Sequence, residues 1–201
     1  KLDEAQKIFK KVIELKPDCV EAHNGLGLTL DKLGMLFEAE ASFKKVIELK
    51  PDHIPSYFNL GNVSRKLNKL DDAEASFKKV VELKPDHIQS YFNLGNVSRK
   101  LNKFDDAEAS FKKVIELKPD HAIALNNLGN ILCYKGDLLA SIRSFKQALN
   151  IRPDLNLAWH SIYRPLQMIK PQTKSINDYL LLLDEKVTSK YAQISKSILS
   201  Y

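Results

Sequence analysis

Hydrophobic residues recur along most of the chain at spacings of three and four, which is the period of an amphipathic helix. In residues 54–84 two such stripes occur, separated by the polar pair Asn68-Lys69. The first stripe passes through Tyr57, Leu60, Gly61 and Leu67, and the second through Leu70, Ala73, Phe77, Val80, Val81 and Leu83. A Lys-Pro-Asp triplet then ends the helix, because proline lacks a backbone donor and the residue before it avoids the helical region. The segment therefore predicts two helices joined by a turn.

This pattern repeats with a period of 34 residues. Each period ends in a Lys/Arg-Pro-Asp triplet, and the prolines of these triplets are Pro17, Pro51, Pro85, Pro119 and Pro153. Segments 51–84 and 85–118 differ at only three positions, which are Pro55/Gln89, Leu70/Phe104 and Val81/Ile115. A fixed period of this length is typical of solenoids, in which each repeat buries its hydrophobic face against its neighbours.

The repeats resemble the tetratricopeptide repeat, a helix-turn-helix unit of the same length. When the proline is placed at position 32, position 8 is Gly27, Gly61, Gly95 and Gly129, and position 24 is Phe43, Phe77, Phe111 and Phe145. Position 20 is Ala39, Ala73 and Ala107, but Ser141 in the fourth repeat. The small residues allow the two helices of a repeat to approach closely. The resemblance implies an all-α, right-handed superhelical solenoid.

The pattern divides the chain into a solenoid, residues 1–164, and a tail, residues 165–201. The solenoid comprises a half repeat at 1–19, full repeats at 20–53, 54–87, 88–121 and 122–155, and a degenerate unit at 156–164. In the degenerate unit Trp159 occupies position 4, but Pro165 is expected to interrupt the helix. The tail is expected to be a linker and an amphipathic helix, which caps the last repeat or connects it to a further domain or another chain.

Asparagine recurs at two positions on the first helix of successive repeats. Position 6 is Asn59, Asn93 and Asn127, and position 9 is Asn62, Asn96 and Asn130, whereas the first repeat has Gly25 and Leu28. Asparagine is a poor helix former, and its carboxamide both donates and accepts hydrogen bonds. It could therefore pair with the N–H and the C=O of an extended peptide, whatever the side chains of that peptide.

The strings Tyr-Phe-Asn-Leu-Gly-Asn and Leu-Asn-Asn-Leu-Gly-Asn resemble the repeats of O-GlcNAc transferase. In that family the first helices line an inner groove, and the asparagines at position 6 form a ladder along the substrate backbone. The resemblance implies main-chain recognition of a peptide by Asn59, Asn93 and Asn127. The alternative is that the asparagines, above all those at position 9, bond neighbouring helices or water.

Positions 12 and 13 of the second and third repeats add the pairs Arg65-Lys66 and Arg99-Lys100. These cations would form a basic stripe beside the asparagines and favour an acidic peptide; the alternative is a solvated charged face. The formal net charge is +6. Aromatic and basic residues do not interleave as they do where bases stack, so a nucleic acid partner is not expected.

The sequence contains no pattern that predicts an enzyme, a cofactor or a metal site. His53, His87 and His121 each follow a Pro-Asp pair and recur one repeat apart, which is too far for a shared metal ion. The longest hydrophobic run, residues 179–183, is far shorter than the roughly 20 residues of a membrane span. Two cysteines, Cys19 and Cys133, cannot build a disulfide framework and favour a reducing, cytoplasmic compartment. Position 12 places Cys133 where it would face the groove.

The sequence thus predicts a protein–protein interaction module that binds an extended polypeptide in a groove. One alternative is the substrate-targeting arm of a larger glycosyl- or sulfo-transferase-like enzyme, because the half repeat at Lys1 and the tail ending at Tyr201 suggest a fragment. A second alternative is a scaffold that self-associates. In that case the unpartnered helix at 2–15 would expose Phe9, Val12 and Ile13 and form a homodimer through the exposed repeat end.

Overall fold

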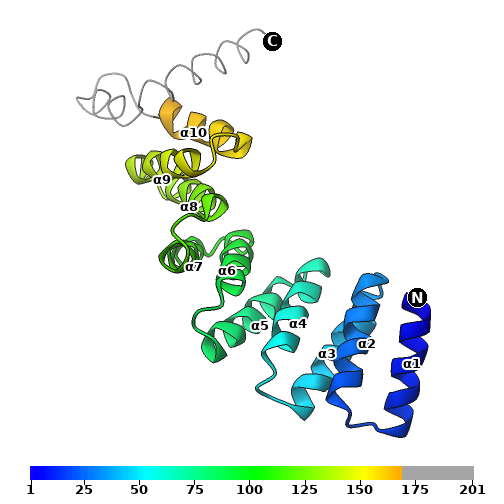
Figure 1. Cartoon of the computed structure of the whole chain (residues 1–201). Coiled ribbons are helices and arrows are strands. Elements are labelled where there is room, and N and C mark those ends of the chain that lie inside the picture. The colour runs from blue at the N-terminus through cyan, green and yellow to red at the C-terminus, as the bar shows by residue number, and fades with distance from the viewer. Residues whose placement is uncertain (169–201) are drawn as a thin grey trace. The chain divides into compact units, whose positions relative to one another are not determined.

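The computed structural model describes residues 1–168, which form ten α-helices and no strand (Figure 1). The all-α helix-turn-helix fold expected from the sequence is confirmed. The chain divides into two compact units, an N-terminal unit of residues 1–103 and a C-terminal unit that begins at Phe104. The N-terminal unit contains α1 (Leu2–Leu15), α2 (Val20–Lys32), α3 (Leu36–Leu49), α4 (Ile54–Lys66), α5 (Leu70–Leu83) and α6 (Ile88–Lys100). The C-terminal unit contains α7 (Phe104–Leu117), α8 (Ala122–Tyr134), α9 (Leu138–Ile151) and α10 (Asn156–Met168).

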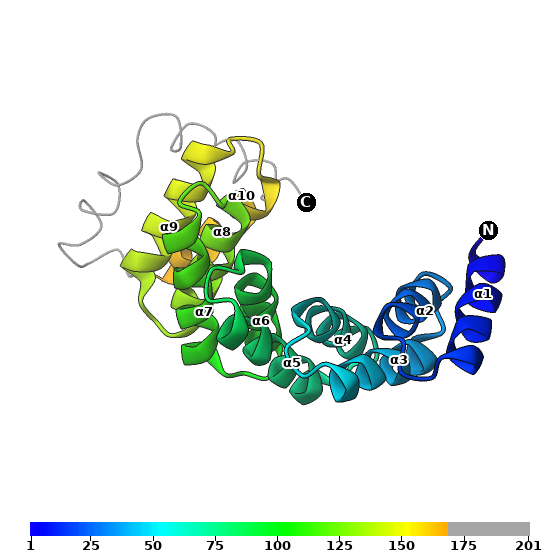
Figure 2. The same ribbon diagram turned by 60° about the horizontal axis from the view of Figure 1, so that its bottom comes forward.

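In the N-terminal unit each helix packs against the next along the chain. Figure 2 shows α2 and α4 in one row and α3 and α5 in a second row beside them. In the first two repeats a phenylalanine of the second helix meets a glycine of the first: a Cβ added to Gly61 would lie 2.7 Å from the Phe77 ring, and one added to Gly27 would lie equally close to Phe43. Both rings are fully buried. The position-8 glycine is therefore required because the ring occupies the space of its missing side chain.

The turns between the two helices of a repeat use left-handed backbone. Asn68 and Asn102 both have φ of 59°, and Gly34 and Gly136 have φ of 77° and 84°. Asparagine and glycine adopt this conformation at less cost than other residues. The polar break that separates the two hydrophobic stripes therefore also supplies the residue that the turn geometry demands.

Buried glutamates tie each repeat to the following one. Glu40 on α3 is 4% exposed, and it accepts hydrogen bonds from Lys44 and Lys69, both at 2.7 Å. Lys69 directly precedes α5, so this carboxylate links two repeats. Burial raises the pKa of Glu40, but the two lysines outweigh that effect and leave its pKa below the ordinary value. Glu74 is held in the same way by Lys78 at 2.9 Å and Lys103 at 2.5 Å.

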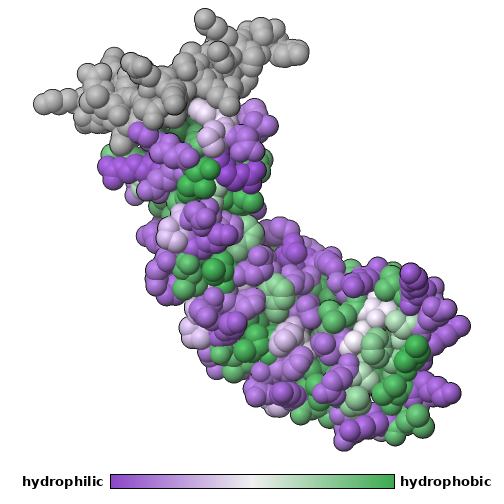
Figure 3. All heavy atoms as spheres, in the orientation of Figure 1, coloured by the Kyte–Doolittle hydropathy of each residue, from purple (hydrophilic) through white to green (hydrophobic). Residues whose placement is uncertain are grey.

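Helix α1 packs more closely than its sequence suggests. Phe9 and Ile13 are half-buried against the core of α2 and α3, and the Phe9 ring fills the space beside Gly25. Val12 is half-buried as well, so the expectation that Phe9, Val12 and Ile13 are exposed is wrong. The exposed hydrophobic residues of this helix are Leu2, Ile8 and Leu15, and Figure 3 shows hydrophobic residues gathered over the α1–α2 end. Self-association through this end remains a prediction.

The C-terminal unit has its core between α8, α9 and α10. This core includes Leu125, Ile142, Phe145, Ala158, Trp159 and Ile162. The indole Nε1 of Trp159 donates to the Pro153 carbonyl oxygen at 2.9 Å. Helix α10 continues through Pro165 to Met168, so the prediction that this proline interrupts the helix is wrong. Burial of Trp159 and Ile162 against α8 and α9 offsets the missing backbone hydrogen bond. The predicted helix of the tail lies outside the described residues.

Candidate functional site

Helices α4 and α6 carry eight of the ten residues that the sequence predicts for peptide binding. Those on α4 are Asn59, Asn62, Arg65 and Lys66, and those on α6 are Asn93, Asn96, Arg99 and Lys100. All eight belong to the N-terminal unit, in which α5 packs against both helices. The other two, Asn127 and Asn130, lie on α8 of the C-terminal unit and are described separately.

The side chains of Asn93 and Asn62 form a hydrogen bond with each other. Asn93 is 9% exposed, and its Nδ2 donates to Asn62 Oδ1 at 3.2 Å. Gln89, one turn earlier on α6, donates from its Nε2 to Asn93 Oδ1 at 3.3 Å. A buried carboxamide needs such partners, because an unsatisfied polar group is costly away from water. This pair therefore ties α4 to α6, as the alternative interpretation of the sequence anticipated.

Asn59 has a different environment from its counterpart Asn93. It is half-buried, and among residues 1–168 nothing forms a hydrogen bond with its side chain. It lines a cavity of about 400 Å³ together with Ile54, Pro55, Phe58, Lys84 and His87. The residue one turn earlier is Pro55, which carries no polar side-chain atom, whereas Gln89 holds the carboxamide in the third repeat. The other partner of Asn93 is Asn62 of the preceding repeat, and its counterpart for Asn59 is Leu28. Pro55 and Leu28 together thus leave the Asn59 carboxamide without a hydrogen-bond partner among residues 1–168.

The remaining asparagines are engaged to different degrees. Asn96 donates from its Nδ2 to the Phe92 carbonyl oxygen in its own helix at 2.9 Å. In the C-terminal unit the buried Asn126 donates to Asn127 Oδ1 at 3.4 Å, and Asn130 is half-buried. Cys133, which the sequence placed toward the groove, is buried at 6% exposure, and this burial raises the pKa of its thiol.

Within residues 1–168, three of the four cations beside the asparagines form no ion pair. Lys66 donates to both carboxylate oxygens of Asp31 on α2, at 2.6 and 2.7 Å. Arg65, Arg99 and Lys100 are exposed and form no ion pair with any residue of the described range. The difference between Lys66 and Lys100 follows from the residue at position 12 of the preceding repeat, which is Asp31 for Lys66 and Arg65 for Lys100. Lys100 therefore faces no carboxylate at the position where Lys66 finds one. These three residues are called the basic cluster below.

The recurring histidines begin the first helix of three repeats. His87 Nδ1 accepts a hydrogen bond from the Ser90 backbone N–H at 3.2 Å, and His121 Nδ1 accepts from Ala124 at 3.1 Å. In the second repeat the His53 Nδ1 lies 2.9 Å from the Ser56 hydroxyl. Burial is the main cause that lowers the pKa of both His87 and His121 below 6.5. The imidazoles of His87 and His121 therefore act as neutral N-caps, a role that the sequence pattern did not reveal.

The caps predict a pH dependence of stability. A protonated imidazole cannot accept the backbone hydrogen bond, and the folded pKa lies below 6.5, so stabilisation is complete above pH 6.5 and is lost as pH falls through the folded pKa. Lowering the pH from 7.5 to 5.5 should reduce the free energy of unfolding by up to about 1 kcal/mol per cap. Urea unfolding at both values measures this loss. Replacing His87 and His121 by asparagine keeps a capping acceptor and should remove most of the loss; an unchanged pH dependence would contradict the assignment.

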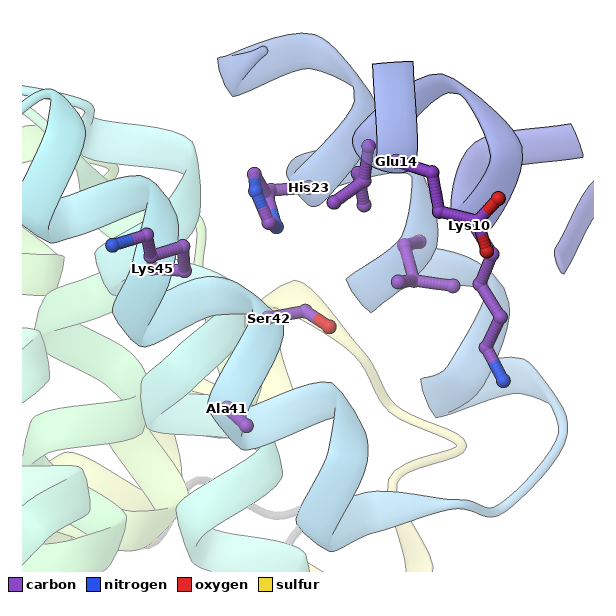
Figure 4. Close-up of a pocket in the computed structure, with 8 residues that line it drawn as sticks. Lys10, Glu14, His23, Ala41, Ser42 and Lys45 are labelled. Atoms are coloured by element: carbon purple, nitrogen blue, oxygen red, sulfur yellow. The ribbon is translucent and has the colours of Figure 1, made fainter. Parts of the chain in front are cut away.

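A second cavity, of about 390 Å³, lies between α1 and α3 (Figure 4). Figure 4 shows His23 of α2 with Lys10 and Glu14 of α1 on one side and Lys45 of α3 on the other. Position 4, which is His23 here, is Tyr57 and Tyr91 in the next two repeats. His23 Nε2 donates to the Pro17 carbonyl oxygen at 2.8 Å and fills less space than a tyrosine would. The hollow follows from this smaller ring, and it contains none of the predicted site residues.

Comparisons with known protein families and solved structures agree with the repeated pairs of helices. Family models described as tetratricopeptide repeats match residues 1–19, 20–53, 54–87, 88–121 and 121–152. The chain belongs to the tetratricopeptide repeat family. No curated protein matches its sequence. Within residues 1–168 no helix has the length and hydrophobicity needed to cross a bilayer, and no three His, Cys, Asp or Glu residues of that range gather where they could hold a metal ion.

Solved structures of other tetratricopeptide repeat proteins are similar to the chain. YrrB, described as a TPR protein with an unusual peptide-binding site, is 28% identical with a TM-score of 0.75, over 80% of this chain and 82% of its own. MamA is 26% identical with a TM-score of 0.73, over 76% of this chain and 89% of its own. MamA from Desulfovibrio magneticus RS-1 is 21% identical with a TM-score of 0.71, over 77% of this chain and 88% of its own, and shows the shared fold alone.

Proposed function

We propose that the N-terminal unit binds an extended, acidic polypeptide along α4 and α6, with Asn59 as its main-chain contact. The observation that carries this proposal is the open carboxamide of Asn59, which lines a cavity and has no side-chain partner within residues 1–168. A carboxamide offers two donors and an acceptor, which match the N–H and C=O groups of an extended chain. The peptide-binding site described for YrrB supports this class of function.

Under this proposal the three asparagines at position 6 do not contribute equally to peptide binding. Asn93 contributes to the tie between α4 and α6, so a peptide would gain little by competing for its carboxamide. In the C-terminal unit Asn127 and Asn130 offer a further contact on α8. The main-chain contact of the N-terminal unit is therefore assigned to Asn59 alone, with Asn62 and Asn96 supporting the helices around it.

The basic cluster gives the proposal its preference for acidic chains. Arg65, Arg99 and Lys100 lie in the last turns of α4 and α6, where the helix dipoles also favour cations. Because these charges are exposed, they act mainly by attracting an oppositely charged chain and raising its rate of association at low salt. The contribution should fall as the ionic strength rises, because exposed charges are screened.

Charge reversal tests this preference. A variant with Arg65→Glu, Arg99→Glu and Lys100→Glu should bind a fluorescein-labelled, Glu-rich unstructured peptide about tenfold more weakly in 20–50 mM salt, a loss of about 1.4 kcal/mol. Fluorescence polarisation measures the affinity, and the difference should shrink in ~0.5 M salt.

The matched control carries Lys7→Glu, Lys10→Glu and Lys11→Glu on α1, where three exposed lysines allow the same change in net charge. Equal losses in both variants would mean that only the net charge matters, and the assignment to α4 and α6 would fail.

A further inference from the structure

We propose that the cavity beside Asn59 selects one large apolar side chain of the bound peptide, preferably flanked by an acidic residue. This inference rests on the proposed function and adds the side-chain chemistry that the site recognises. The cavity lies entirely within the N-terminal unit, between α4 and the start of α6. Its volume of about 400 Å³ is within the range of small ligand pockets and can hold a leucine or phenylalanine side chain.

Aromatic rings form the walls of this cavity. The Phe58 and His87 rings lie edge to face, with centroids 5.2 Å apart and an interplanar angle of 61°. Phe58 is held from behind by the buried Phe77 ring, at 6.0 Å and 60°. Ile54 and Pro55 complete the lining with aliphatic surface. Rings fixed in this way provide rigid apolar walls, which favour an apolar side chain and cost little ordering on binding.

The polar atoms of the lining are mainly donors. Lys84 contributes an exposed ammonium, and none of the lining residues is a carboxylate. Because His87 Nδ1 accepts the Ser90 N–H, the neutral ring carries its hydrogen on Nε2, which is then a donor as well. An apolar wall with cationic and N–H donors at its edge matches an apolar residue next to a carboxylate.

The second repeat differs from the first at several residues that line this cavity, and from the third only at Pro55. In the first repeat the residues corresponding to Pro55 and Phe58 are Glu21 and Asn24, and Asn24 Oδ1 accepts a hydrogen bond from the Ser56 hydroxyl at 3.3 Å. In the third repeat Gln89 stands in place of Pro55 and bonds Asn93. A bound peptide is therefore anchored at one place, and this anchor sets its register along the helices.

The test uses labelled peptides Gly-Ser-Glu-X-Glu-Ser-Gly in which X is Phe, Leu, Ala or Ser. The unchanged chain should bind the Phe and Leu peptides at least about fivefold more tightly than the Ala and Ser peptides, equivalent to about 1 kcal/mol. Replacing the flanking Glu by Lys should weaken binding further. Phe58→Ala should abolish the selectivity, whereas Phe92→Ala, the equivalent change in the third repeat, should leave it intact.

A second variant guards against misfolding of Phe58→Ala. Pro55→Gln introduces the residue that the third repeat already holds, so the fold is retained, and the new carboxamide should occupy Asn59 and reduce the preference for Phe. Equal affinity for all four peptides, or selectivity that survives both variants, would overturn the proposal that this cavity selects an apolar side chain. Peptide binding itself would remain supported. Binding of none of the peptides would contradict both the pocket and the proposed function.

Discussion

Replacing Phe77 with alanine should lower the free energy of unfolding by about 3–5 kcal/mol. The ring is fully buried, it occupies the space above Gly61, and it packs with Ala73, Leu94 and Val97 between α5 and α6. Its removal would leave a cavity that the surrounding helices cannot close, because Gly61 has no side chain to move into it. Such a loss is a large fraction of the stability of an ordinary domain.

Urea unfolding followed by circular dichroism at 222 nm measures this effect. Phe37→Ala is the matched control, because Phe37 is 67% exposed and its ring contact is with the Lys69 ammonium, 5.4 Å from the ring centroid. The control should lose no more than about 1 kcal/mol. Similar losses at the two positions would show that the glycine–phenylalanine contact is not what holds the two helices of a repeat together.

Asn59 and Asn93 should respond to alanine in opposite ways, although they occupy the same position in nearly identical repeats. Asn59→Ala should weaken binding of an acidic peptide about tenfold, through a hydrogen-bond loss of about 1.5 kcal/mol. It should change stability by less than about 0.5 kcal/mol, because the side chain is half-buried and has no partner to lose within residues 1–168. Asn93→Ala should instead lower the free energy of unfolding by about 1–3 kcal/mol, because it removes the hydrogen bond between α4 and α6 and leaves the half-buried Asn62 carboxamide without its partner.

The comparison needs both measurements on both variants. Peptide affinity by fluorescence polarisation and stability by urea unfolding give four values, and each variant serves as the control for the other. The proposal would be wrong if Asn93→Ala stayed stable but no longer bound peptide while Asn59→Ala bound it normally. The main-chain contact would then belong to the third repeat. Equal effects would favour the even ladder that the sequence resemblance implied.

Most of the fold could be predicted from the sequence because it depends on local periodicity. The spacing of Tyr57, Leu60 and Leu67 defines a helical face, and the Lys-Pro-Asp triplet defines where the second helix ends. Both signals are contained within one repeat. The prediction at Pro165 failed because it considered only the backbone, whereas the helix is held by the burial of Trp159 and Ile162 against other helices.

The site was harder to predict because its differences arise between repeats. The sequence shows three equivalent asparagines, yet their hydrogen bonds depend on which side chains lie within about 3 Å across α4 and α6. The pair of Asn62 and Asn93 spans 31 residues, and Lys69 reaches a carboxylate 29 residues away. Two signals were nevertheless present: Pro55 stands where the third repeat has Gln89, and Leu28 stands where the second repeat has Asn62. Both replaced residues bond Asn93, so Asn59 lacks both hydrogen bonds.

The central claim is that Asn59 contacts the backbone of a bound peptide. The most direct measurement is an NMR titration of the ¹⁵N-labelled chain with the peptide in which X is Phe, following the side-chain amide signals of the asparagines, with Asn59 assigned from the spectrum of Asn59→Ala. The Asn59 side-chain signal should shift strongly and saturate with the peptide, while the signal of Asn93 should change much less. Saturable binding that leaves the Asn59 signal in place would contradict the claim.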